Sequence, residues 1–220
     1  MKIPDYNKRP LKDYCYETND SFGGIQKLYQ FDNQMGASVI QHEGSYGYDS
    51  GKWELAVLNE NGENIFSNKD GSATEMFKHY IGGLQKYMPE ALLIFAPYSN
   101  SYRRFLSYWS SPVNLEWATD NRSVGLRVPD CEPQNRRVEN RLAGSDVNPY
   151  LVLAATLACG YMGIEEKIEP RKAIEGSAYD LPFSLHRHMY ASIDAFSQSK
   201  AMRKMFGDSF VDMYSGIKQK

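Results

Sequence analysis

Arginines are concentrated in one short stretch, residues 121–144, which reads NRSVGLRVPDCEPQNRRVENRLAG. Five of its side chains are guanidinium groups and only three are acids. Guanidinium groups repel one another and are rarely buried without a partner. We therefore expect an anionic ligand among these arginines, which are Arg122, Arg127, Arg136, Arg137 and Arg141.

The spacing within the segment RRVENRL suggests what that ligand is. In a strand, Arg137, Glu139 and Arg141 would project from one face, because side chains alternate. A carboxylate able to hold a hard cation would then lie between two groups able to bind phosphate or carboxylate. Arg122 and Arg127 lie on the preceding strand, within hairpin reach. The pattern predicts a pocket for a polyphosphate and its magnesium.

A second interpretation of the same spacing is a solvated sheet face. Cross-strand pairs between arginine and glutamate are common on such faces and contribute little to stability. The spacing alone leaves both interpretations open.

The elements that would position these residues alternate between helices and short strands. Ser72 is the expected N-cap of a helix over residues 72–88, with Glu75 three residues later. The strongest helix signal covers 148–168, with Pro149 near its first position. Further helices are predicted over 21–36, 189–206 and 208–219, and strands over 37–44, 111–118, 123–129 and 136–142. Residues 52–66 are predicted to form a strand, a turn at Asn61-Gly62 and a second short strand. This order predicts an α+β fold with a mostly antiparallel sheet and packed helices.

Composition narrows the classes of function. The formal net charge of −2 argues against a nucleic-acid partner, which would require a broad basic surface. No run of about 18 apolar residues is present, so we expect no membrane span. The start, MKIPDYNKRPLKDY, lacks the apolar stretch of a signal peptide, and the three cysteines are far apart. A cytoplasmic location is the resulting expectation.

Several motifs occur together in order: NSYRR, SPVN, NRS, LRVP, RRVENR and NPYLVLAA. Their order and gaps resemble the C-terminal catalytic domain of the glutamine synthetase family over residues 72–220, and more loosely over 23–58. The stretch GLRVPD…PQNRRVENRLAG is most similar to the γ-glutamylpolyamine branch, the glutamate–putrescine ligases. The resemblance implies an ATP-dependent ligase that joins the γ-carboxylate of glutamate to an amine through a γ-glutamyl phosphate.

The resemblance also implies binding roles for four arginines. Arg104, in NSYRR, and Arg141 would bind glutamate. Arg122 would contact both glutamate and the nucleotide phosphates, and Arg127 would contact the nucleotide. The implied partners are therefore ATP, glutamate and an amine, and intact relatives are expected to be homo-oligomers.

Catalysis and metal binding are assigned in the same way. Arg137 would stabilise the phosphoryl group in transit, and with Arg122 it forms the implied catalytic pair. Glu139 would bind Mg²⁺ or Mn²⁺, joined by Glu43 and Glu54 from two acidic segments. Phosphoryl transfer requires charge neutralisation more than proton transfer, which agrees with arginines and a divalent metal.

Three departures from the family pattern bear on these roles. Residues 1–220 resemble a single catalytic domain, with an internal deletion near residues 55–59 and no N-terminal β-grasp domain. The deletion would remove a metal-binding histidine. Ser110 stands where ammonia-using members carry a glutamate that deprotonates ammonium, which favours putrescine or another primary amine.

Two alternatives therefore remain open. One is a glutamine synthetase that uses ammonia, and the other is a catalytically incomplete remnant that binds nucleotide or associates with intact family members. The histidines do not decide between them: His186 and His188 are expected to be exposed or helix-capping rather than metal ligands, and His79 to pack within a helix.

Overall fold

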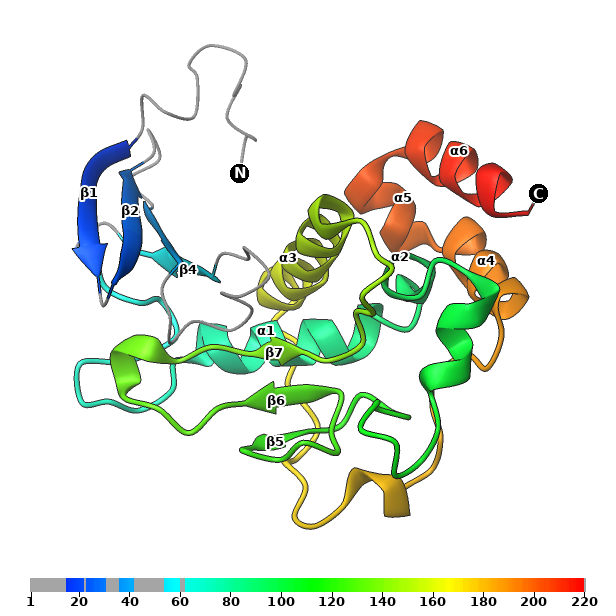
Figure 1. The fold of residues 1–220 in the computed structure, drawn as a ribbon, viewed down its shortest axis with the longest axis horizontal. Coiled ribbons are helices and arrows are strands. Elements are labelled where there is room, and N and C mark those ends of the chain that lie inside the picture. The colour runs from blue at the N-terminus through cyan, green and yellow to red at the C-terminus, as the bar shows by residue number, and fades with distance from the viewer. Residues whose placement is uncertain (1–14, 22, 31–35, 42–53, 60–61, 220) are drawn as a thin grey trace. The chain divides into compact units, whose positions relative to one another are not determined.

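The computed structural model describes residues 15–21, 23–30, 36–41, 54–59 and 62–219 (Figure 1). The chain divides into two compact units, one of residues 1–72 with 132–135 and the other of residues 73–131 with 136–220. The resemblance to a single catalytic domain over residues 1–220 stays a prediction.

The first unit contains a four-stranded antiparallel sheet in the order β1-β2-β3-β4. Its strands are β1 (Cys15–Ser21), β2 (Gly24–Gln30), β3 (Gly36–Gln41) and β4 (Glu54–Leu58). The helix predicted over 21–36 is therefore wrong. Its apolar residues also suit a strand, and β2 pairs with a neighbour on each side, which satisfies its backbone groups.

The turn predicted after β4 is present. Gly62 adopts a positive φ of 76° and donates its N–H to the Asn59 carbonyl at 3.0 Å. The strand expected after this turn is reduced to an isolated bridge between Leu58 and Asn64.

The second unit is built on two helices, α1 (Glu75–Tyr87) and α3 (Pro149–Glu165). The N-cap of α1 is Thr74, whose side chain accepts from the Phe77 N–H, and not Ser72 as predicted. Ser72 is engaged locally, because both its N–H and its hydroxyl donate to Asp70. α3 begins as predicted, with the Asn148 side chain as N-cap and proline in the first turn.

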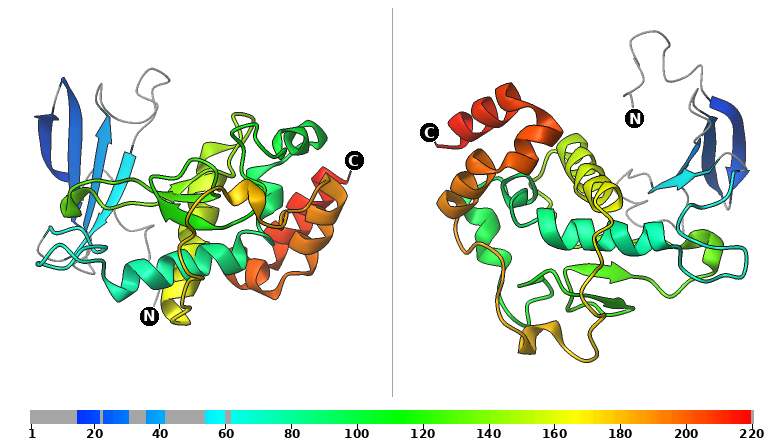
Figure 2. Two further views of the ribbon diagram at one scale, coloured as in Figure 1. Left: turned by 90° about the horizontal axis from the view of Figure 1, so that it is seen from below. Right: turned by 180° about the vertical axis from the view of Figure 1, so that it is seen from behind.

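Helices α1 and α3 cross each other, as Figures 1 and 2 show, and glycines allow their close contact. A Cβ added at Gly83 would lie 2.4 Å from the Cys159 carbonyl oxygen, and one added at Gly163 would lie 2.2 Å from the His79 carbonyl oxygen. Only glycine permits so close an approach of the two backbones. Fully buried Ile81 and Leu84 place apolar side chains of α1 in the core.

Four shorter helices complete the helical part: α2 (Leu92–Phe95), α4 (Met189–Gln198), α5 (Lys200–Phe206) and α6 (Asp208–Lys218). The helix predicted over 189–206 is interrupted at Ser199, which has extended backbone and caps α5 by accepting from the Met202 N–H. His188 caps α4, accepting from the Ala191 N–H, as its capping interpretation expected. Within the described residues, every helix is too short or too polar to cross a membrane.

A second sheet lies in the arginine-rich part of the chain, with Arg127 on one of its strands and the other four arginines of residues 121–144 outside the strands. Its order is β5-β6-β7, with strands β5 (Trp117–Thr119), β6 (Leu126–Val128) and β7 (Glu139–Asn140). β5 and β6 run parallel, and β6 and β7 antiparallel. Together with the antiparallel first sheet and the helices, this arrangement confirms the predicted α+β class.

Two side-chain hydrogen bonds fasten this second sheet to the long helices. The Asn140 amide of β7 donates to the Thr156 hydroxyl of α3 at 2.9 Å. The buried Gln85 amide of α1 donates to the Leu115 carbonyl, just before β5, at 2.8 Å. The strands that carry the candidate site therefore rest on a packed helical support.

Candidate active site

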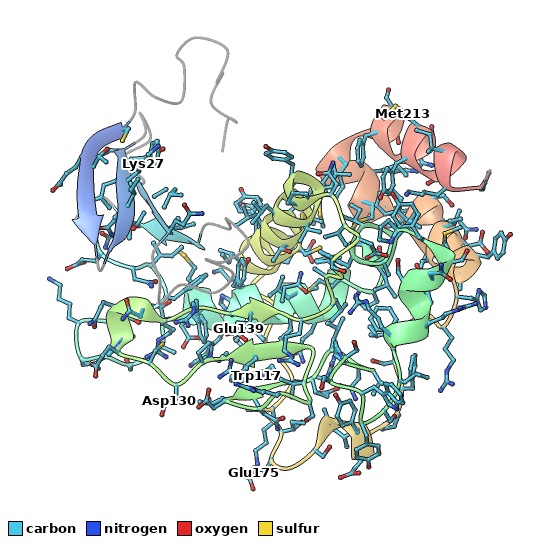
Figure 3. All side chains as sticks on the ribbon, viewed as in Figure 1. Lys27, Trp117, Asp130, Glu139, Glu175 and Met213 are labelled. Carbon is cyan, nitrogen blue, oxygen red and sulfur yellow. The ribbon has the colours of Figure 1, made fainter. Side chains whose placement is uncertain are left out.

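The centre of the candidate site is an ion pair across β6 and β7. Arg127 and Glu139 are register partners, and Arg127 Nη1 donates to both Glu139 carboxylate oxygens at 3.1 and 3.0 Å. Arg127 Nη2 donates to Asp120 Oδ1 at 2.6 Å. One guanidinium group thus bridges two carboxylates. Figure 3 labels Glu139 on β7 and Trp117 on β5, the strands on either side of β6.

Asp120 is held in its charged form by these contacts. The hydrogen bond from Arg127 lowers the pKa of the Asp120 carboxyl, and the Asp130 N–H and the charge of exposed Arg122 lower it further. Asp120 adopts a positive φ of 52°, a conformation that aspartate tolerates better than most residues. The turn between β5 and β6 therefore places an acid against the arginine of β6.

Arg141 connects β7 with an exposed loop. Its backbone N–H donates to the Gly125 carbonyl at 3.0 Å, and its Nη2 donates to the Ser110 carbonyl at 2.9 Å. Tyr108 and Ser110 both have positive φ values, of 66° and 64°, which non-glycine residues rarely adopt. The loop where the resemblance expects a glutamate therefore lies directly on Arg141.

Arg104, one of the arginines predicted to bind glutamate, is half-buried. It ends a 3-10 helix, Ser99–Arg104, stacks on the Phe105 ring at 4.3 Å, and donates to the Phe95 carbonyl at 3.4 Å. Burial lowers the pKa of its guanidinium, and the nearby Asp146 carboxylate opposes that shift. Asp146 is itself held by the Ser101 hydroxyl, which donates to it at 2.5 Å.

Three of these arginines have a donor that the protein does not use. Within the part of the chain that the structure describes, the buried Nε atoms of Arg104, Arg127 and Arg141 have no hydrogen-bond partner. A buried donor without an acceptor costs about 1–3 kcal/mol. Anions with several oxygens, such as phosphates and carboxylates, are the natural acceptors for arginine.

Some of the predicted constellation is not brought together. The strand predicted over 136–142 is present but contains only the two residues of β7, so strand alternation does not extend from Arg137 to Arg141. Arg136 instead lies 5.6 Å from the centre of the Phe77 ring of α1. Arg137 is half-buried and Arg122 is exposed. Their implied roles stay predictions.

Among the three predicted metal ligands, only Glu139 has a side chain that the structure describes. Glu43 lies outside the described residues, and Glu54 begins β4 but its side chain is not described. Glu139 faces Arg127 and is not part of any described group of three converging ligands. A single carboxylate can hold Mg²⁺ only together with phosphate oxygens and water, since Mg²⁺ is commonly bound through one or two carboxylates plus substrate phosphates, so the metal role of Glu139 stays a prediction.

Two acids were missed by the sequence reasoning. Asp120 and Asp146 contact or lie near the arginines of the site, Arg127 and Arg104 respectively. Their position next to arginine motifs could have indicated a role, because Asp120 lies just before NRS and Asp146 lies shortly after RRVENR. Position alone does not tell which arginine each acid meets.

Comparison with known proteins gives the family. A family described as "Glutamine synthetase, catalytic domain" matches residues 53–220. A gamma-glutamylputrescine synthetase of Escherichia coli is 32% identical over 167 residues, 74% of this chain and 35% of that protein. A glutamate–isopropylamine ligase of a Pseudomonas species is 30% identical over 201 residues, 89% of this chain and 44% of that protein.

A glutamine synthetase of Vibrio cholerae is 34% identical over 176 residues, 74% of this chain and 37% of that protein. The match therefore spans less than half the length of each of these three relatives. The family match, in contrast, covers most of the present chain and includes every arginine of the candidate site. The chain belongs to the glutamine synthetase family, and it carries sequence of that family's catalytic domain.

Proposed function

We propose that this protein takes part in ATP-dependent ligation of the γ-carboxylate of glutamate to a primary amine such as putrescine. The observation that carries the proposal is the set of three buried guanidinium donors without acceptors, those of Arg104, Arg127 and Arg141. They accompany the Arg127–Glu139 pair in a chain of the glutamine synthetase family. A dicarboxylate substrate and a triphosphate would supply the missing acceptor oxygens.

The reaction proceeds in two steps. A γ-carboxylate oxygen of glutamate attacks the γ-phosphorus of ATP, the bond to ADP breaks, and γ-glutamyl phosphate forms. The amine nitrogen then attacks the acyl carbon, the carbon–oxygen bond to phosphate breaks, and the nitrogen loses a proton. Both steps require positioning and neutralisation of negative charge.

The arginines divide these tasks in the proposal. Arg104 and Arg141 hold glutamate, Arg122 and Arg127 hold the nucleotide phosphates, and Arg137 stabilises the phosphoryl group during transfer. Glu139 would hold a divalent cation, Mg²⁺ or Mn²⁺, together with the phosphates. When bound, that cation neutralises charge that develops on the phosphate oxygens.

The preference for an amine over ammonia rests on Ser110. Its side chain carries no carboxylate that could attract and deprotonate ammonium, and its backbone carbonyl contacts Arg141. Two of the relatives described above are named for ligation of putrescine or isopropylamine. An ammonia-using glutamine synthetase is the alternative, because another relative bears that name.

The direct test is ADP release by the purified chain. Mg-ATP and glutamate would be supplied with putrescine, isopropylamine or ammonium in separate reactions. We expect ADP release that requires both glutamate and an alkyl amine. Equal release with ammonium would contradict the amine preference.

A second candidate function is a binding role without catalysis. It is favoured because the match covers less than half the length of each of these relatives. In that case the chain binds nucleotide, or associates with intact family members, without turnover. No ADP release with any amine, combined with retained binding of a fluorescent ATP analogue, would support this candidate against the ligase.

A further inference from the structure

A second group of potential ligands lies on α1 and on the segment after α3, outside the arginine site. Glu75 and His79 are four residues apart on α1, so both occupy one face of the helix. Glu169 approaches them from the later segment, with its Oε1 atom 3.0 Å from His79 Nε2. One ligand atom from each of the three residues lies within 4.8 Å of the other two.

Close packing fixes the backbone around this group. A Cβ added at Gly82, three residues after His79, would lie 2.0 Å from the Ile168 carbonyl oxygen. The Arg171 N–H donates to the Gln85 side chain of α1 at 2.8 Å, two residues beyond Glu169. The His79 side chain is only 15% exposed. His79 and Glu169 are therefore presented to each other by a packed contact between α1 and the later segment.

The spacing suits a metal ion. Zinc binds histidine nitrogen at about 2.0–2.1 Å and carboxylate oxygen at about 2.0–2.2 Å, so two ligands of a tetrahedral site lie about 3.3 Å apart. His79 Nε2 and Glu169 Oε1 need to separate only slightly from 3.0 Å to reach that geometry. The exposed Glu75 side chain can complete a third position by changing its rotamer.

We propose that Glu75, His79 and Glu169 form a surface site for a zinc-class divalent cation, with water completing the coordination. Imidazole with carboxylates suits zinc, manganese and related ions, whereas magnesium prefers oxygen ligands alone. The ion would link α1 to the segment after α3 and so act on stability. This role is separate from the metal proposed to act with ATP.

Lys78 is the built-in competitor of such an ion. Its Nζ lies 2.6 Å from Glu75 Oε1, so the ammonium group competes with a bound cation for the Glu75 carboxylate. Without a metal, Glu75 pairs with Lys78 and His79 pairs with Glu169. This competition gives the proposal a test in which affinity rises.

The experiment is calorimetric titration of zinc into the full chain, without nucleotide and in excess magnesium, which occupies sites made of oxygen alone. We expect a single zinc site in the unmodified chain. His79→Gln should abolish it, and Glu169→Gln should weaken it about tenfold. Lys78→Gln should tighten zinc binding about two- to fivefold, because it removes an ammonium group whose ion pair with Glu75 is as weak as other surface ion pairs. Cobalt absorption in the visible range provides a readout of coordination that is independent of activity.

Two matched variants serve as controls. Glu175→Gln removes an exposed carboxylate from the same segment outside the group, and His188→Asn replaces another histidine while keeping a helix-capping side chain. Both should bind zinc as the unmodified chain does. The proposal is overturned if the unmodified chain binds no zinc, if His79→Gln binds it equally well, or if Lys78→Gln binds no tighter. Loss of the site in His188→Asn would overturn it as well.

Discussion

Adjacent arginines in this chain have different environments. Arg103 is exposed, whereas Arg104 is half-buried, stacks on Phe105 and has a buried donor without an acceptor. Enclosure of this kind gives a guanidinium group a fixed orientation, which a freely solvated arginine lacks. The pair therefore provides an internal comparison of equal charge and adjacent position.

Arg104→Lys should weaken glutamate use while Arg103→Lys should not. Lysine keeps the positive charge but loses the planar fork that binds a carboxylate through two hydrogen bonds. One charged hydrogen bond is worth about 1.5 kcal/mol or more, so the KM for glutamate should rise roughly tenfold in Arg104→Lys. The measurement is ADP release as a function of glutamate concentration. An unchanged KM in Arg104→Lys would show that charge alone matters at this position, and an equal rise in both variants would show that the enclosure of Arg104 is not what binds glutamate.

At the scale of elements, the crossing of α1 and α3 depends on glycines. A Cβ added at Gly83 would lie 2.4 Å from the Cys159 carbonyl oxygen and 2.6 Å from the Gly163 Cα atom. These are backbone atoms of a second helix, so relief requires the helices to separate. The same two helices carry the hydrogen bonds that support the β5–β7 sheet.

Gly83→Ala should therefore lower the free energy of unfolding by about 3 kcal/mol, the upper part of the usual range for overpacking. Gly216→Ala is the matched control, because Gly216 lies in helix α6 with nothing within 4 Å of the added Cβ. That control should gain about 0.5–1 kcal/mol from helix propensity alone. Urea unfolding followed by circular dichroism measures both, and a stable Gly83→Ala variant would contradict the packing argument.

The C-terminal end of α3 is fastened to α1 by Glu166. The Tyr87 hydroxyl donates to its carboxylate at 2.5 Å, and Lys86 pairs with it at 2.9 Å. The hydrogen bond from Tyr87, followed by that from Lys86, lowers the pKa of Glu166 below its ordinary value of 4.5. A carboxyl group whose pKa is lowered on folding stabilises the protein above its unfolded pKa.

The stability contributed by Glu166 should thus be present above pH 4.5 and be lost as the pH falls through the lower folded pKa. Glu166→Gln cannot titrate, so the variant should lose less stability than the unmodified chain over the same acidic interval. Melting temperatures recorded from neutral pH to below pH 4 test this difference. Parallel decline of the two proteins would mean that other carboxylates dominate acid unfolding.

At the scale of the whole molecule, ligand binding and stability are linked. A ligand that binds only the folded chain stabilises it by about 2.7 kcal/mol at 100 times its dissociation constant. If the arginines hold nucleotide phosphates, Mg-ATP should raise the melting temperature and adenosine should not. The measurement is a thermal scan with each ligand in turn. An equal shift with adenosine would place recognition outside the arginine site.

Part of the fold could be predicted from the sequence, and α3 and β2 show which part. Asn148 and the following proline mark the start of α3, because capping is decided by neighbouring residues. Residues 24–30 form a strand despite helical spacing, because pairing on both sides satisfies their backbone groups. Short apolar runs fit either period, and only the presence of partner strands decides between them.

The sequence by itself determined the family, through the order of its arginine motifs, and its density of guanidinium groups predicts an anionic ligand. The tertiary structure alone decided which acid meets which base. Strand register sets Glu139 opposite Arg127, and the packing of α1 against a later segment brings Glu169 to His79 across 90 positions of sequence. Such pairings depend on long-range register and helix crossing, which local spacing does not encode.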